Sequence, residues 1–244
     1  MASHTKNISG IIYRTYNSGI SDKVVNVISN NGKKITCIAK AIKSQNSKKA
    51  YSIEIGNLVK LQLLEGYALP LITDVILQNE FSHWKKDLKG ITSLQFICEI
   101  VDNFTYEESP APEVFDLFEE VLNHSSASTL LKLSYFLLKL LNITGNLPEL
   151  DKYNDNEEPI VNGEAYFSSD IIGFVSKEVG QDSNLISPLI YKTQKFFLAK
   201  DLKNSLKINL SDDLCLSMFR IHLGWLNQVI DKKLKTFDLL MKVI

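Results

Sequence analysis

Lysine and arginine side chains gather in the first third of the chain in a pattern suited to binding phosphate groups. The segment from residue 40 to residue 49 carries four lysines among small polar residues, and Arg14, Lys33 and Lys34 are candidates that precede it. The cations of interest are Arg14, Lys33, Lys34, Lys40, Lys43, Lys48 and Lys49. Each can neutralise a backbone phosphate, so together they are candidates for lining a groove that follows nucleic acid.

Tyrosines accompany these cations. Tyr16 is a candidate stacking platform for a base, and Tyr13, Tyr51 and Tyr67 are further candidates. Single-strand binding combines a basic groove with aromatic rings, since every base has a face that can stack. The alternative is that these tyrosines only fill and rim the fold that carries them.

The formal net charge of −1 hides an asymmetry along the chain. Residues 1–80 contain nine Lys and one Arg against five acidic residues, a balance of +5. Residues 81–244 contain 17 basic and 23 acidic residues, a balance of −6, and the two balances sum to −1. Polyanion binding is therefore expected in the N-terminal part, although a solvated lysine face without a partner explains the charge equally well.

Five β-rich segments occupy the first third and predict the elements that position these cations. Asn31-Gly32 separates the second and third of them and predicts a hairpin with a type I′ turn. Five short strands at this spacing predict a small closed barrel of the OB type, because closure removes exposed strand edges. The segments are residues 8–16, 23–29, 33–42, 58–64 and 68–77.

A helical pattern follows residue 78. Residues 126–143 are apolar nearly all round, which predicts a helix at the centre of a bundle. An acidic connector is expected over residues 149–168, with helices resuming near Ser169 and another helix starting at Ser211. The predicted fold class is α+β: an OB-fold domain over residues 1–80 and an all-α helical domain over residues 81–244.

The sequence contains no recognisable catalytic or metal-binding motif. Three scattered cysteines, Cys37, Cys98 and Cys215, predict free thiols and no zinc site, and the four histidines lack ligand spacing. No cofactor or catalytic residue is expected, although Asp151, Asp155 and Glu157 leave a metal-dependent nuclease as an alternative. The chain lacks an apolar run long enough for a membrane span and begins with a polar segment, so a cytoplasmic location without membrane contact is expected.

The order of several short motifs resembles the RecO family of bacterial DNA repair proteins. The matching segments are Gly10 to Arg14, Ser21 to Lys23, Asn31 to Lys33, Ala39-Lys40 with Ser47, Leu137 to Leu150 and Trp225 to Leu239. Many members of that family carry four cysteines of a zinc module after the Leu147-Pro148-Glu149-Leu150 segment, whereas residues 151–170 contain none. The resemblance therefore implies a zinc-free member.

This resemblance implies a mediator of recombinational repair, which works by binding and has no catalytic turnover. Such a protein binds single- and double-stranded DNA, anneals complementary strands and joins RecR to load recombinase, in the cytoplasm at the nucleoid. It also recognises the acidic, hydrophobic C-terminal tail of single-stranded-DNA-binding protein. An adaptor that binds proteins without contacting DNA remains the alternative among non-enzymes.

The tail needs an apolar slot with a basic rim, and the apolar central helix offers one candidate. Lys132 and Lys139 lie seven positions apart on nearly the same face, with Phe136 and Leu140 nearby. These four residues are the predicted peptide site. The alternative is that both lysines extend to solvent from a structural helix.

Overall fold

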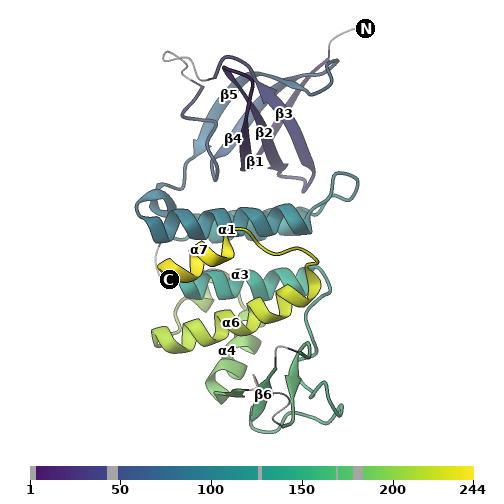
Figure 1. Ribbon diagram of the computed structural model, residues 1–244, viewed down its shortest axis with the longest axis vertical. Helices are drawn as coiled ribbons and strands as arrows, with labels where there is room; N and C mark the ends of the chain where they lie inside the picture. The colour runs from purple at the N-terminus through teal and green to yellow at the C-terminus, as the bar shows by residue number, and fades with distance from the viewer. Residues whose placement is uncertain (1–3, 43–48, 126–127, 169, 178–183) are drawn as a thin grey trace. The chain divides into compact units, whose positions relative to one another are not determined.

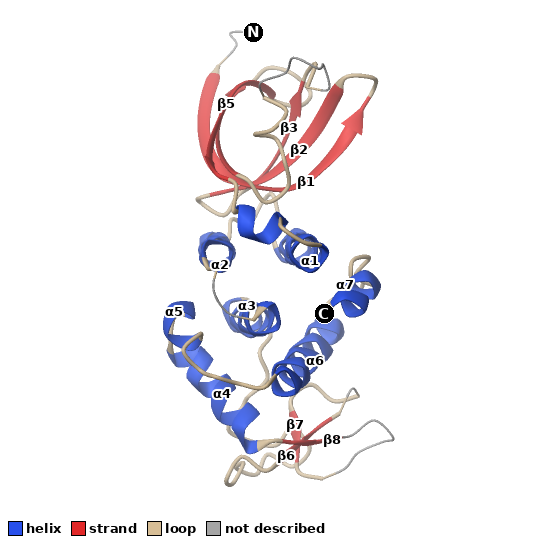
Figure 2. Cartoon of the chain, turned by 90° about the vertical axis from the view of Figure 1, so that its left-hand side faces the viewer, coloured by secondary structure: helices blue, strands red, loops and turns tan. Residues whose placement is uncertain are grey.

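The computed structural model describes residues 4–42, 49–125, 128–168, 170–177 and 184–244 (Figures 1 and 2). Two compact units divide the chain: Met1–Ser125 with Leu234–Ile244, and Ser126–Lys233. The first unit extends beyond residue 80 because helices that follow the strands pack with the barrel. The division into an OB-fold domain over residues 1–80 and a helical domain over residues 81–244 stays a prediction.

Five strands form a closed barrel in the order β1-β2-β3-β5-β4. All neighbouring strands are antiparallel except β3 and β5, which run parallel where Ile38 pairs with Leu71. This order confirms the predicted α+β fold with an N-terminal barrel of the OB type. The strands are β1 (Thr5–Ser18), β2 (Asp22–Ser29), β3 (Lys34–Ala39), β4 (Leu58–Leu64) and β5 (Leu71–Asn79).

The first strand is long enough to pair with two neighbouring strands, β4 and β2, along different parts of its length. Its first half pairs with β4 and its second half pairs with β2. The register with β2 shifts between Ile12 and Arg14, so Tyr13 forms a bulge. Ile8 and Ile12, before the bulge, belong to the buried core of the barrel, together with Val25 and Val27 of β2.

The turn between β2 and β3 confirms the predicted hairpin but not its type. Gly32 has φ 76° and Asn31 has no positive φ, whereas a type I′ turn needs positive φ at both central residues. Ser29 accepts a hydrogen bond from Gly32 N at 2.7 Å and donates its own N–H to the Lys33 carbonyl at 3.0 Å. This is a three-residue loop with glycine in the left-handed region, so the type I′ prediction was wrong.

Four helices complete the described part of the first unit. They are η1 (Ser82–Lys85), α1 (Leu88–Phe104), α2 (Pro112–Asn123) and α7 (Phe237–Val243). The helix α1 packs against β1, and Trp84 of η1 donates its indole N–H to the Leu122 carbonyl at 3.2 Å. The Glu99 carboxylate of α1 accepts hydrogen bonds from the backbone of Lys235 and from the backbone and hydroxyl of Thr236, which attaches α7 to α1.

The second unit is built around α3 (Thr129–Ile143), which packs against α4 (Pro188–Ala199) and α6 (Asp212–Val229). Most of α3 is buried, as its apolar sequence predicts. A short helix, α5 (Leu202–Ser205), follows α4. The predicted start of α6 is confirmed, since the Ser211 hydroxyl accepts from Leu214 N at 3.4 Å. None of the helices in the described part of the chain is long and apolar enough to cross a membrane.

The region before α4 corrects one expectation. The described residues around position 169 form no helix, and Ser169 itself lies outside them. Three short strands lie in this region in the order β7-β6-β8. They are β6 (Ala165–Phe167), β7 (Phe174–Val175) and β8 (Asn184–Ile186). Phe174 and Val175 are fully buried, and such aromatic and β-branched residues favour strands.

The acidic connector is attached to this small sheet by hydrogen bonds. The Asp155 carboxylate accepts from the backbone N–H and the hydroxyl of Ser176, at 2.8 and 2.6 Å. The backbone N–H of Asn154 donates to the Phe174 carbonyl at 2.7 Å, and its side chain donates to the Ile172 carbonyl at 2.6 Å. Residues 149–168 therefore include folded structure.

A buried histidine joins three helices of the second unit. His222 Nδ1 lies 2.9 Å from the Ser134 carbonyl oxygen, which can only accept, so Nδ1 carries the hydrogen. Nε2 then accepts from the Gln194 amide at 3.0 Å. Burial lowers the pKa of His222 to about 3, although the bond to the Ser134 carbonyl opposes the shift, so the ring stays neutral.

Acidification should destabilise the second unit through this histidine. Its pKa is about 6.5 in the unfolded chain and about 3 in the folded one, so only the unfolded chain takes up the proton as pH falls below 6.5. The free energy of unfolding should drop by about 2 kcal/mol between pH 7 and pH 5 from this group alone. Urea unfolding followed by Trp225 fluorescence measures it. In His222→Gln, whose amide can still donate to Ser134, the drop should shrink by that amount; an unchanged drop contradicts the assignment.

Candidate nucleic-acid interface

The bulge in β1 turns two predicted site residues to the outside of the barrel. After it, Arg14 pairs with Asn26 and Tyr16 with Val24, whereas the core residue Val25 pairs with Thr15. Arg14 and Tyr16 therefore lie on the outer face of β1, next to the outer faces of β2 and β3. In OB barrels, the face formed by the second and third strands binds oligonucleotides.

Arg14 and Tyr16 form an exposed pair on this face. The Arg14 side chain is 57% exposed and Tyr16 is 48% exposed. The guanidinium carbon lies 6.0 Å from the centroid of the Tyr16 ring. The pair thus presents a permanent cation beside an aromatic surface, which is the combination that a phosphate and its stacked base require.

Lys34 has a different environment although it was predicted alongside Arg14. Its ammonium donates to the Asp102 carboxylate at 2.8 Å and to the Asp102 carbonyl at 2.6 Å, and its side chain is only 14% exposed. It also lies 5.6 Å from the centroid of the Tyr13 ring. Lys34 therefore connects β3 to α1.

Asp102 is shared between the two cations. Its second carboxylate oxygen lies 3.2 Å from Arg14 Nη1. The carboxylate comes from α1, 88 residues after Arg14 and 68 after Lys34, and no sequence motif marks it. It partly neutralises the face that Arg14 presents.

Tyr13 is a buried structural residue and does not present its ring on the surface. It is 4% exposed, and its hydroxyl accepts a hydrogen bond from Asn26 at 3.4 Å. Burial raises the pKa of Tyr13 well above its ordinary value, which keeps the ring neutral. Of the candidate aromatics, Tyr16, Tyr51 and Tyr67 are exposed.

The remaining predicted cations do not form one cluster. Lys33 and Lys40 are exposed at opposite ends of β3, roughly 20 Å apart along an extended strand. Lys49 is half-buried and donates to the Thr73 carbonyl. Lys43 and Lys48 lie outside the described residues. Among the described cations, the structure brings Arg14 and Lys34 together through Asp102.

The four predicted peptide-site residues lie on α3. Phe136 and Leu140 are fully buried and Lys132 is 4% exposed. Burial lowers the pKa of Lys132 to about 8. Lys139 donates to the Leu198 carbonyl at 3.0 Å and lies 5.5 Å from the centroid of the Tyr135 ring. Peptide binding at these residues stays a prediction, and it would require side chains to move.

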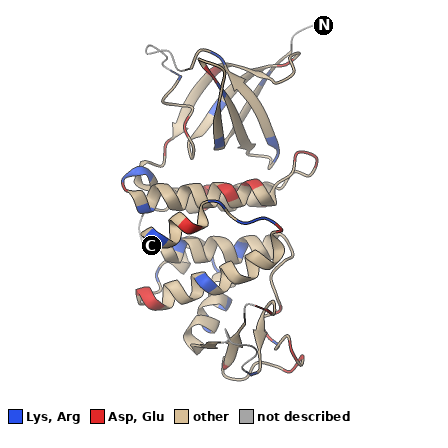
Figure 3. Cartoon of the chain, in the orientation of Figure 1, with Lys and Arg blue, Asp and Glu red and all other residues tan. Residues whose placement is uncertain are grey.

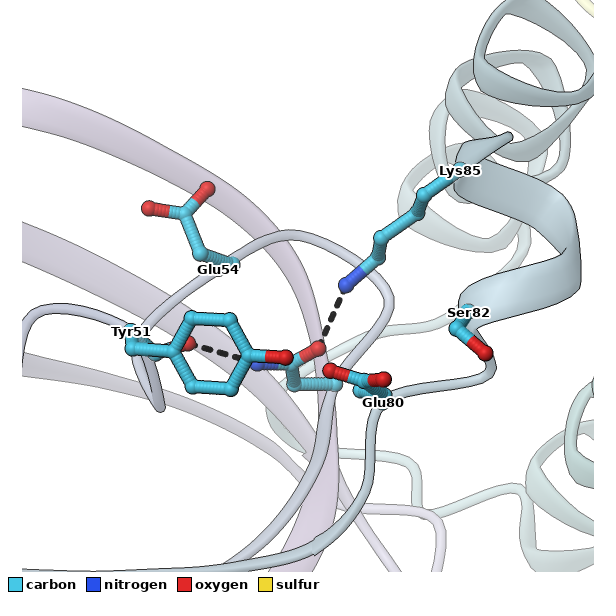
Figure 4. A pocket seen from close by; sticks show the side chains of 6 residues that line it. Tyr51, Glu54, Glu80, Ser82 and Lys85 are labelled. Carbon is cyan, nitrogen blue, oxygen red and sulfur yellow. Dashed lines mark hydrogen bonds between the residues drawn. The ribbon is translucent and has the colours of Figure 1, made fainter. Parts of the chain in front are cut away.

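A polar cavity of about 330 Å³ lies in the first unit. Its lining comprises Tyr51, Glu54, Asn57, Glu80, Ser82 and Lys85 (Figure 4). The Lys85 ammonium donates to the Asn57 side-chain carbonyl. Burial lowers the pKa of Lys85, and the two glutamates oppose that shift. Two carboxylates against one ammonium disfavour phosphate, so this cavity does not extend the basic face.

The described residues contain neither a cluster of metal ligands nor a reactive thiol. No group of three or more His, Cys, Asp or Glu side chains there is placed to hold a metal ion, and this includes the acids of residues 151–158. The three cysteines are buried. Burial raises the pKa of each thiol, that of Cys37 to about 12, so they are poor nucleophiles in this fold.

The chain has the fold of proteins in which an OB-type barrel is followed by helices, and its candidate site lies on the outer face of β1 to β3. The family model described as "Recombination protein O C terminal" matches residues 85–237. The chain belongs to the RecO family, which confirms the resemblance seen in the sequence motifs.

Relatives named "DNA repair protein RecO" match most of the chain. The protein from Clostridium acetobutylicum is 25% identical over 241 residues, covering 95% of each chain. The one from Clostridium perfringens is 24% identical over 243 residues, again covering 95% of each. The one from Dehalococcoides mccartyi is 24% identical over 212 residues and 84% of each chain. These relatives support a role in DNA repair and recombination.

The contacts of Lys34 predict that it stabilises the first unit, whereas its neighbour Lys33 does not. Lys34→Met removes two hydrogen bonds to Asp102 but keeps most of the apolar stem, and should lower the free energy of unfolding by about 1–2 kcal/mol. The exposed Lys33→Met is the matched control and should stay within about 0.5 kcal/mol of the parent. Urea unfolding followed by Trp84 fluorescence compares them, and equal effects would rule out the structural role.

Proposed function

We propose that this protein is a mediator of recombinational DNA repair that binds single- and double-stranded DNA on the outer face of β1 to β3 and anneals complementary strands. The observation that carries the proposal is the exposed pair of Arg14 and Tyr16 on that face. Membership of the RecO family supports the same role. The protein acts by binding and not by catalysis.

The chemistry of this face suits annealing. A cation that contacts phosphate and a ring that stacks on one face of a base leave the pairing edge of the base free. A second strand can then pair with the bound one without displacing the protein first. Because phosphate contacts release counterions, the binding weakens as salt rises and the strands remain exchangeable.

The partners belong to the same proposal. Together with RecR, the protein helps load recombinase onto DNA, at the nucleoid. Its helical domain receives the C-terminal tail of single-stranded-DNA-binding protein, with Lys132, Phe136, Lys139 and Leu140 as the predicted contact residues. The resemblance to the RecO family is the support for both partners.

Arg14 and Tyr16 should contribute to oligonucleotide binding in different ways. Arg14→Ala removes a phosphate contact and should reduce the slope of log affinity against log salt by about 0.7 on a single strand. Tyr16→Ala removes a stacking surface worth about 1–3 kcal/mol and should weaken binding with no change in slope. Fluorescence anisotropy with a labelled single strand over a salt series measures both.

Tyr106→Ala provides the matched control, since Tyr106 is 64% exposed in the same unit but follows α1. It should bind and anneal like the parent. Both interface variants should also slow the annealing of complementary strands. If Arg14→Ala and Tyr16→Ala bind DNA as the parent does, the outer face of β1 is not the interface. If the parent binds no DNA at all, the protein-binding adaptor replaces the proposal.

Removing the charge of Asp102 should strengthen DNA binding. The Asp102 carboxylate competes with a DNA phosphate for the Arg14 guanidinium, and Asp102→Asn weakens this competition by removing the negative charge. Because the Arg14 side chain is 57% exposed and water screens its charge, the gain should be roughly two- to fivefold. Asp74→Asn, on the exposed face of β5, removes the same charge elsewhere and should give a smaller gain. Equal gains from both variants would show that only overall charge matters.

A further inference from the structure

The turn between β1 and β2 carries the most exposed large apolar side chain of the described residues. Ile20 is 97% exposed and is the middle residue of a three-residue loop, Gly19 to Ser21, between Ser18 of β1 and Asp22 of β2. A partner that covers such a side chain gains free energy from removing it from water. Exposed apolar residues scattered singly are ordinary, so the surroundings of Ile20 decide what it contacts.

Hydrogen bonds hold this turn in place. Gly19 has φ 61°, in the left-handed region that lets β1 reverse direction. The Asp22 carboxylate accepts from the Ser21 hydroxyl at 3.1 Å and from the backbone N–H of Ala41, which follows β3, at 2.9 Å. Isoleucine is also stiff at its first side-chain torsion, because it is branched at Cβ. Ile20 therefore loses little conformational entropy when it makes a contact.

The turn lies at the end of β2 that is remote from α2. At the other end of β2, the turn from Asn30 to Gly32 contacts the residue before α2, since the Gly32 carbonyl accepts from the backbone N–H of Ala111 at 3.1 Å. The strand β2 has eight residues, so the two turns lie roughly 25 Å apart. The contact with α2 therefore occupies one end of the β2 strand and leaves Ile20 accessible at the other.

The outer face of β1 leads from the candidate interface to this turn. Arg14 and Tyr16 lie on that face, and Ser18 is the next outward position by the alternation of a strand. The strand ends at Ser18, and Ile20 follows in the turn. Because residues two apart in a strand are about 7 Å apart, a single strand of DNA that stacks on Tyr16 and continues along β1 reaches Ile20 within a few nucleotides.

A further cation stands beside the turn. Lys40 is exposed and directly precedes Ala41, whose backbone N–H donates to Asp22 at the base of the turn. The strands of the barrel carry Lys and Arg, which are blue in Figure 3. Cations therefore flank the apolar Ile20, with Arg14 on β1 and Lys40 after β3. DNA offers both kinds of complementary surface, since its phosphates are charged and the faces of its bases are apolar.

We propose that Ile20 is a wedge that covers the face of the terminal base pair where single-stranded DNA meets a duplex. The inference rests on the proposed function, since it takes single-stranded DNA to lie along Arg14 and Tyr16. An isoleucine covers the face of a base pair without hydrogen bonds to base edges, so the contact is independent of sequence. During annealing, this contact would stabilise the junction at which new base pairs form.

Fluorescence anisotropy of the whole chain with two labelled DNAs tests the wedge: a single strand, and a duplex that ends in the same strand as a single-stranded tail. The parent should prefer the tailed duplex. In Ile20→Ser this preference should fall roughly five- to tenfold, because the apolar contact is lost, while binding of the single strand stays unchanged. Ile20→Leu should keep the preference. A 2-aminopurine in the terminal base pair should change its fluorescence when the parent binds, and much less when Ile20→Ser binds.

Ile76→Ser is the matched control. Ile76 is 56% exposed on β5, so the same substitution removes an exposed isoleucine from another part of the same barrel. This variant should keep the preference for the tailed duplex. Circular dichroism checks that each variant is folded, which the exposure of both side chains favours.

The single strand separates the fate of the wedge from that of the proposed function. If the parent binds the single strand but does not prefer the tailed duplex, the wedge is refuted and the proposed function stands. If the parent binds neither DNA, both fail. An unchanged preference in folded Ile20→Ser would also refute the wedge and would indicate a protein partner for this turn. Equal losses in Ile20→Ser and Ile76→Ser would show that the contact is not specific to the turn, which overturns the proposal as well.

Discussion

A single extra residue in β1 decides which side chains of the barrel reach solvent. Ile8 and Ile12 face the core at even positions, and strict alternation would point Arg14 and Tyr16 inward as well. The bulge at Tyr13 reverses the alternation, so that Thr15 pairs with the core residue Val25 and its two neighbours face outward. Without it, a guanidinium would enter an aliphatic core, which costs far more than a barrel of this size can offset. The barrel and its candidate interface therefore depend on the same irregularity.

The carboxylate of Asp102 is the second constraint on this face, and it explains why cations that look equivalent in the sequence differ in the structure. Lys34 donates two hydrogen bonds to Asp102 and is largely buried. Arg14 contacts the same carboxylate with most of its side chain exposed. Because Asp102 contacts both cations, it attaches β3 to α1 through Lys34 and neutralises only part of the positive charge of Arg14 and Lys34. Since water screens the exposed Arg14 side chain, a phosphate can replace Asp102 at Arg14 more easily than at Lys34.

Local patterns in the sequence predicted the elements better than their details. Strand periodicity and the Asn31-Gly32 pair were sufficient for the barrel and the hairpin, but the turn type depends on the backbone angle of Asn31, which no residue pattern specifies. The helix expected near Ser169 failed because buried Phe174 and Val175 pair as strands, and tertiary contacts outweigh local propensity there. Asp102 could not be found at all, because its role arises from contacts 68 and 88 residues away.

The lysines of the second unit show how burial separates structural cations from those available to a partner. Lys132 and Lys139 belong to a helix that its unit buries on most sides, and Lys139 hydrogen-bonds to the carbonyl of Leu198 at the end of α4. Lys192 and Lys195 lie on a helix with one side buried and one side exposed, so both charges reach the surface. Sequence spacing treats both sets alike, since each places lysines on one face of an apolar helix. What distinguishes them is burial: nearly every residue from Leu130 to Leu141 of α3 is buried, whereas α4 is buried on one side only.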